Sequence, residues 1–236
     1  MLIAAGIILC VGIGWLALSF FFPSLLPFSF FDRQETGERV LPRPRTSPSF
    51  FRTEKTVSLG ARRTEQTAFL EKIRALASAP AEEAKITALA ITIEGEREER
   101  FATLDDFFTL SRIQAPAEFL SRIEDAPVFF LGGVGDSARF GFAVKTRDPD
   151  RTLADMIKWE PSLPGDFSPL FFGKTPPLVF PPFENETTDN VDWRSLTLSA
   201  ERRLGIYYAL FPAGNILVVT TDKPLMENII TRLLHK

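Results

Sequence analysis

The side chains that most often carry enzyme chemistry are scarce in this chain of 236 residues. It has one histidine, His235, next to the C-terminus, and one cysteine, Cys10, inside an apolar N-terminal run. A zinc site needs several clustered ligands, and a serine hydrolase needs a histidine base that is held in place to a tight tolerance. The sequence therefore predicts no metal, no cofactor and no catalytic site built on histidine or cysteine.

Two further groups of residues could do chemistry, but each has a simpler structural role. Gly132, Gly133 and Gly135 follow an apolar stretch, yet a phosphate-binding loop needs Lys-Ser/Thr or a helix after its glycines, and a second strand follows here. Paired carboxylates occur at Asp105-Asp106, Glu124-Asp125 and Asp148-Pro-Asp150. Such pairs serve as acid and base only where burial separates their pKa values. We expect a turn at the glycines, and helix ends or loops at the carboxylates.

The most unusual segment beyond the N-terminus is Pro161 to Glu184, which holds seven prolines and five phenylalanines. A loop of this length without regular structure is uncommon unless it is functional. Its rings either fold back onto the sheet or form a rigid surface on which a partner protein docks. The candidate partner-binding residues are Phe167, Phe171, Phe172, Phe180, Pro181, Pro182 and Phe183.

The pattern of apolar residues predicts an α+β fold with a mainly antiparallel β-sheet and packed helices. Strands are expected at 85–94, 128–135, 139–146, 192–199, 205–211 and 216–221. Helices are expected at 62–79, after residue 103, at 116–123, from about 150 to 159, and at 224–234. Thr103 and Asp106 resemble a capping box at the start of one helix, and Asp222 is placed to cap the last one.

The first 31 residues contain no charged side chain, and the run from Leu2 to Phe22 is almost wholly apolar. About 20 such residues span the hydrocarbon layer of a bilayer, whereas a signal peptide has a basic start and an apolar run of about 7–15 residues. We expect a retained transmembrane helix. Its anchor residues include Leu2, Ile7, Trp15, Phe20 and Phe22.

Three parts of the chain are therefore expected. Residues 1–31 form the transmembrane anchor and an interfacial segment, residues 32–61 form a linker containing Pro and Arg, and residues 62–236 form a soluble α+β domain. Charges of both signs are intermixed over a net charge of −3, which excludes a broad nucleic-acid surface.

The orientation of the domain has two readings. The arginines at 33, 39, 43 and 45 follow the span, and the positive-inside rule would keep that side in the cytoplasm. The span begins at Met1 without a flank for comparison, and N-anchored proteins of the cell envelope are common. We expect an extracytoplasmic domain, with the cytoplasmic orientation as the alternative.

Several motifs follow one another in a familiar order. They are Trp159-Glu160 after a helix, the Phe/Pro segment, Asp192-Trp-Arg-Ser-Leu, a strand with both tyrosines, and Ile216-Leu-Val-Val-Thr-Thr221 before a terminal helix. This arrangement resembles a group of uncharacterised single-pass, membrane-anchored envelope proteins of candidate-phyla (small-genome) bacteria. The resemblance covers residues 60–236 and the anchor; it implies an extracytoplasmic domain and no particular activity.

Together these observations predict a membrane-tethered interaction or scaffold module of the cell envelope. Its expected partners are the lipid bilayer and another envelope protein. One alternative is an envelope hydrolase that uses only Asp and Glu, which would need a cleft with two facing carboxylates of raised pKa. The other is a ligand-binding sensor coupled to the membrane helix, which would need an apolar pocket lined by the phenylalanines.

Overall fold

The structure is a computed structural model that describes residues 49–80, 85–94, 99–135, 138–173, 177, 179–201 and 203–235. The predicted anchor, with Leu2, Ile7, Trp15, Phe20 and Phe22, lies outside the described residues. None of the helices in the described ranges combines the length and the apolar character that crossing a membrane requires.

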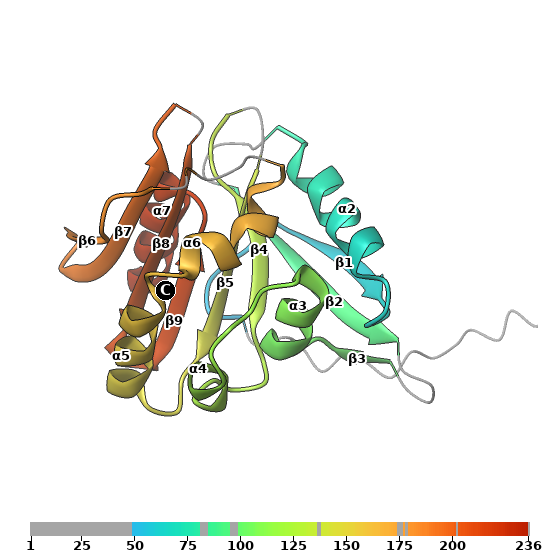
Figure 1. The fold of residues 1–236 in the computed structure, drawn as a ribbon, viewed down its shortest axis with the longest axis horizontal. Coiled ribbons are helices and arrows are strands. Elements are labelled where there is room, and N and C mark those ends of the chain that lie inside the picture. The colour runs from blue at the N-terminus through green and yellow to red at the C-terminus, as the bar shows by residue number, and fades with distance from the viewer. Residues whose placement is uncertain are drawn as a thin grey trace, which may run out of the picture. The chain divides into compact units, whose positions relative to one another are not determined.

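The strands of the described chain form one mixed sheet. Their bounds are Lys55–Ala61 (β1), Thr87–Glu94 (β2), Glu99–Phe101 (β3), Val128–Gly132 (β4), Arg139–Lys145 (β5), Glu184–Thr188 (β6), Val191–Ser199 (β7), Leu204–Phe211 (β8) and Ile216–Thr220 (β9). The order across the sheet is β1-β2-β4-β5-β9-β8-β7-β6, and β3 pairs with β2 (Figure 1). Only β1 and β2 run parallel; the other neighbouring pairs in this order are antiparallel. The predicted α+β class with a mainly antiparallel sheet is confirmed.

Helices cover both faces of this sheet. Their bounds are Gln66–Ala77 (α2), Leu104–Ser111 (α3), Ala117–Ser121 (α4), Pro149–Trp159 (α5), Leu163–Asp166 (α6) and Lys223–Leu234 (α7), with 3₁₀ turns at Ser168–Phe171 (η2) and Pro212–Gly214 (η3). Helices α2 to α6 and η2 pack on one side, which we call the front face, and α7 packs on the opposite, back face (Figure 1).

Two predicted helix starts are confirmed. The Thr103 hydroxyl accepts a hydrogen bond from the Asp106 amide, and the Asp106 carboxylate accepts one from the Thr103 amide, which completes the capping box of α3. The Asp222 carboxylate accepts from the Leu225 amide at the start of α7. Each cap satisfies a backbone donor that the helix itself leaves without a partner.

The front core is centred on the ring of Phe107 in α3. This ring stacks on Phe129 and Phe140 of the sheet, with centroids 4.6 Å and 4.9 Å apart, and meets Phe69 of α2 edge-on at 5.9 Å. Aromatic pairs of this kind contribute about 0.5–1.5 kcal/mol each beyond the burial of area. Helix α3 therefore joins α2 and two central strands into one core.

The back core includes two residues from the start of the described chain. Phe50 and Phe51 are buried with residues of α7, and the Phe51 ring lies edge-on against Phe130 of β4, with centroids 5.3 Å apart. The Phe130 ring in turn lies directly on Gly141 of β5, where a Cβ atom would come within 2.4 Å of the ring. The sheet therefore needs glycine at this position so that Phe130 can pack across β5.

The predicted boundary between linker and domain is corrected by these contacts. Strand β1 and the buried Phe50 and Phe51 lie within residues 32–61, which were expected to be linker. The sequence of β1 alternates apolar residues with Lys, Thr, Ser and Gly, so its strand signal is weak, and pairing with β2 stabilises it. The polar edge strand β6 and the short α6 and η2 were also missed, because β6 has no apolar residue and the other two have only four residues, one of them a proline.

Candidate functional site

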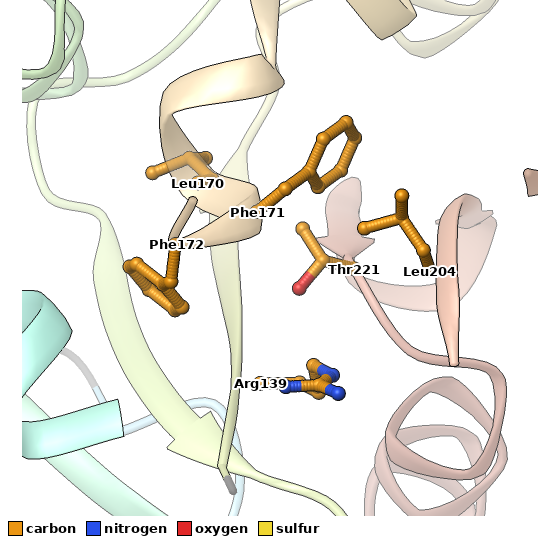
Figure 2. A pocket seen from close by; sticks show the side chains of 6 residues that line it. All are labelled: Arg139, Leu170, Phe171, Phe172, Leu204 and Thr221. Carbon is orange, nitrogen blue, oxygen red and sulfur yellow. The ribbon is translucent and has the colours of Figure 1, made fainter. Parts of the chain in front are cut away.

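One end of the sheet carries a hollow beneath η2. The residues that line it are Arg139, Leu170, Phe171, Phe172, Leu204 and Thr221 (Figure 2). Strands β5 and β8 begin at this end and β9 finishes there, because β9 runs antiparallel to both of them. The hollow is a candidate site because Phe171 and Phe172 belong to the predicted partner-binding residues.

The charged residue of the hollow is Arg139, which is 8% exposed. Its Nε donates to the Arg203 carbonyl oxygen at 3.2 Å and its Nη1 to the Ala138 carbonyl oxygen at 3.4 Å. Burial lowers the pKa of Arg139, the Asp222 carboxylate opposes this change, and the Arg203 guanidinium adds to it. Because a guanidinium keeps its proton in proteins, the hollow holds a fixed positive charge beside apolar walls.

Arg203, whose carbonyl oxygen binds Arg139, forms an ion pair with Asp222 at the start of α7. Arg203 Nη2 donates to Asp222 Oδ2 at 2.6 Å, and Asp222 is 1% exposed while it also caps α7. Gly133 lies against the pair with φ at +117°, and a Cβ atom there would come within 3.0 Å of Asp222 Oδ2. Gly133 therefore follows β4 with a left-handed backbone and passes close to a buried carboxylate, while β4 and β5 pair as antiparallel strands.

The size of the hollow limits what it can bind. Its walls lie so close together that a water-sized sphere does not fit between them, whereas pockets for small-molecule ligands have roughly 300–1,000 Å³. In the conformation that the structure describes, the hollow is a shallow depression with no room for a metabolite or cofactor. Phe172 adopts a left-handed backbone conformation, with φ at +51°, at the rim of the hollow.

Three of the five predicted partner-binding rings are inside the domain. Phe167, Phe171 and Phe183 have 1%, 3% and 8% of their surface exposed, whereas Phe172 and Phe180 are half-buried and pack against the front core. For the three buried rings, the interpretation in which the aromatics fold back onto the sheet is the one observed. A buried ring covers the front face and offers no surface to a partner.

The exposed part of the segment is short. Val179 is 86% exposed, and Pro181 and Pro182 are exposed as well. Phe180 between them packs partly against the front core, and the Phe183 ring after them lies 5.8 Å from the Tyr208 ring. We call residues 179–182 the proline ridge. Phe180 within it and Phe183 after it hold the ridge against the domain, and Pro181 and Pro182 have fixed φ angles.

A polar network next to Phe183 was not predicted from the sequence. The Glu160 carboxylate accepts hydrogen bonds from Arg194 Nε at 2.8 Å, Arg194 Nη2 at 2.9 Å and the Tyr208 hydroxyl at 2.7 Å. Burial raises the pKa of Tyr208 and the bond to Glu160 raises it further, so the hydroxyl remains a donor. The network joins the end of α5 to β7 and β8. Its members are far apart in the chain, so no spacing in the sequence indicates it.

The described carboxyl groups whose pKa values are shifted are all more acidic than usual. Burial raises the pKa of Glu54, Asp106 and Glu186, but hydrogen bonds, including those from Arg or Lys partners, outweigh it and lower each pKa. A general acid needs the opposite shift. Lowered values are typical of ion pairs that stabilise a fold.

In the ranges that the structure covers, no three or more His, Cys, Asp or Glu residues gather in a way that could hold a metal ion. Comparison of the chain with protein-family models, curated proteins and solved structures gave no match.

Proposed function

We propose that this chain is a membrane-tethered, extracytoplasmic interaction module of the cell envelope. The observation that carries the proposal is the uncharged run of residues 1–31, followed closely by a folded domain. Arg232 of α7 donates to the Arg52 carbonyl oxygen and to Glu54 Oε1, so the chain is fixed to the domain just after Phe50 and Phe51. Residues 32–48 reach at most about 60 Å when fully extended. The domain then works close to the bilayer surface.

The proline ridge is the surface that we propose for the partner protein. An exposed aliphatic side chain beside two prolines offers apolar area with little conformational freedom to lose on binding. Phe180 and Phe183 hold the ridge against the front core and Tyr208. The ridge therefore projects from a rigid part of the domain, and docking does not require it to reorganise.

The tether and the orientation can be tested with two fusions at Lys236. Alkaline phosphatase fused there should be active, and green fluorescent protein fused there should be dark, since the first folds outside the cytoplasm and the second inside. His235 is exposed, so the end of α7 can accept a fusion. The chain should also stay in the membrane pellet after extraction with alkaline carbonate. Bright fluorescence would reverse the orientation, and release from the pellet would contradict the tether.

The docking surface can be tested by photo-cross-linking in cells. A photoreactive amino acid at Val179 should give one discrete adduct with a membrane or envelope protein, because this side chain is exposed on the ridge. Ile157 of α5 is a matched control, since it is an exposed aliphatic residue elsewhere on the domain. Equal labelling at both positions, or none at Val179, would contradict the proposed ridge. Point incorporation is preferable to deletion of the segment because Phe183 is part of the core.

A further inference from the structure

The two edges of the sheet differ in their protection. In the described chain, β1 at one edge pairs only with β2, and β6 at the other edge pairs only with β7. Natural sheets protect their edges with charged residues, prolines or short strands. Strand β6 follows this rule, since it has five residues with glutamates at 184 and 186 and follows Pro181 and Pro182.

Strand β1 lacks most of this protection. It has seven residues, Thr56 and Ser58 are exposed, and its one charged residue is Lys55 at the start. Among the described residues, Lys72 of α2 donates from its Nζ to the Gly60 carbonyl oxygen of this strand at 3.1 Å. An edge strand of this kind presents unpaired backbone N–H and C=O groups, which can pair with another strand.

We propose that β1 pairs with β1 of a second copy of this chain, across a two-fold axis through Ser58, to form one continuous antiparallel sheet. In this register Ser58 faces Ser58, Thr56 faces Gly60 and Val57 faces Leu59. Each pair has compatible size and no like charges face each other. Leu59 belongs to the front core and the partly buried Val57 packs against it, so their pairing extends that core across the axis. In the dimer, the Gly60 carbonyl oxygen accepts a hydrogen bond from a backbone N–H of the second copy in place of the one from Lys72.

The symmetry of this dimer suits two tethered chains, and this step rests on the proposed function. A two-fold axis that relates antiparallel strands of one sheet is perpendicular to the sheet, so both back faces point the same way. Phe50 and Phe51 pack on the back face, so both chains would enter their domains on the same side, an arrangement compatible with two anchors in a single bilayer. Tethering to one membrane also raises the local concentration of the two edges.

Charge substitution at Ser58 tests the dimer directly. Residues directly opposite on antiparallel strands have Cβ atoms about 4.5–5.5 Å apart, so Ser58→Lys or Ser58→Glu places two like charges face to face only in the dimer. We expect the full-length wild-type chain in detergent to be dimeric by light scattering. Each variant alone should dimerise about tenfold more weakly or worse. Co-expression of the two variants with different tags should restore a mixed dimer.

The control and the contrary outcomes are equally specific. Thr187→Lys on β6 is a matched change of an exposed hydroxyl residue at the other edge, and it should leave the dimer intact. A monomeric wild type, an unweakened Ser58→Lys dimer, or failure of the mixed pair to associate would each overturn the proposal. Membrane fractionation reports separately on the tether, so failure of the dimer is distinct from failure of the proposed function.

Discussion

Replacing Phe107 with alanine is expected to lower the free energy of unfolding by about 3–5 kcal/mol, the usual range for a fully buried phenylalanine. Its ring is 0% exposed and contacts Phe69, Phe129 and Phe140 at the centre of the front core. The alanine variant loses the transfer energy of the ring and leaves a cavity, because α3 is fixed by its cap and cannot collapse freely onto the sheet.

The measurement is pulse proteolysis of the full-length chain in detergent across a series of urea concentrations. Phe107→Leu is the matched control, since leucine keeps most of the side-chain volume. It should lower the free energy of unfolding clearly less than the alanine substitution does. A loss below about 1 kcal/mol for Phe107→Ala would show that the front core is not built around this ring.

Replacing Asp106 with asparagine is expected to cost about 2–3 kcal/mol, because a buried carboxylate that binds two arginines loses its charge. Asp106 is 0% exposed and accepts from Arg63 Nε at 2.9 Å, Arg100 Nη1 at 2.5 Å and Arg100 Nη2 at 2.9 Å, besides capping α3. The arginines are 57% and 48% exposed at their side chains, so solvent screening keeps the loss below that of a fully buried pair.

The same carboxyl group predicts how stability depends on pH. Burial raises the pKa of Asp106, but the bonds from Arg100, Thr103 and Arg63 outweigh it and hold the pKa well below its usual range. Its contribution is therefore complete above the unfolded pKa of about 4 and is lost as the pH falls toward the lower native value. Unfolding measured between neutral and acidic pH should show this loss in the wild type and a smaller one in Asp106→Asn.

Asp105→Asn is the control for this experiment, since Asp105 lies on the same turn of α3 but is exposed. It should change the free energy of unfolding by less than about 1 kcal/mol, the range for a charge near an exposed helix end. Equal effects of the two substitutions would contradict a special role for the buried carboxylate.

Local patterns indicated several elements of the fold correctly. The capping residues of α3 and α7 lie within a few residues of the groups that they bind. The strands β7, β8 and β9 show either alternating apolar and polar residues or a continuous apolar run between turns. Interactions between near neighbours in the chain leave such signals because the backbone groups and side chains that meet are separated by fixed spacings.

The candidate site could be predicted only in part. The sequence singles out the Phe/Pro segment as a candidate, but composition does not distinguish a buried ring from an exposed one. Phe171 and Phe183 are buried because the front face of the sheet is incomplete without them, and Val179 is exposed because no element packs over it among the described residues. The Arg139 hollow and the Glu160 network join residues distant in sequence, so no motif could indicate them.

The amino-acid sequence by itself determined the uncharged apolar run at the N-terminus, the α+β class and the capped helices, since each depends on composition or on contacts within a few residues. Tertiary structure alone decided that β1 belongs to the sheet, that three of the five rings are core, and that β1 and β6 are the edges. These features depend on which distant segments pack together, and the free energy of that packing arises only when the whole sheet has formed.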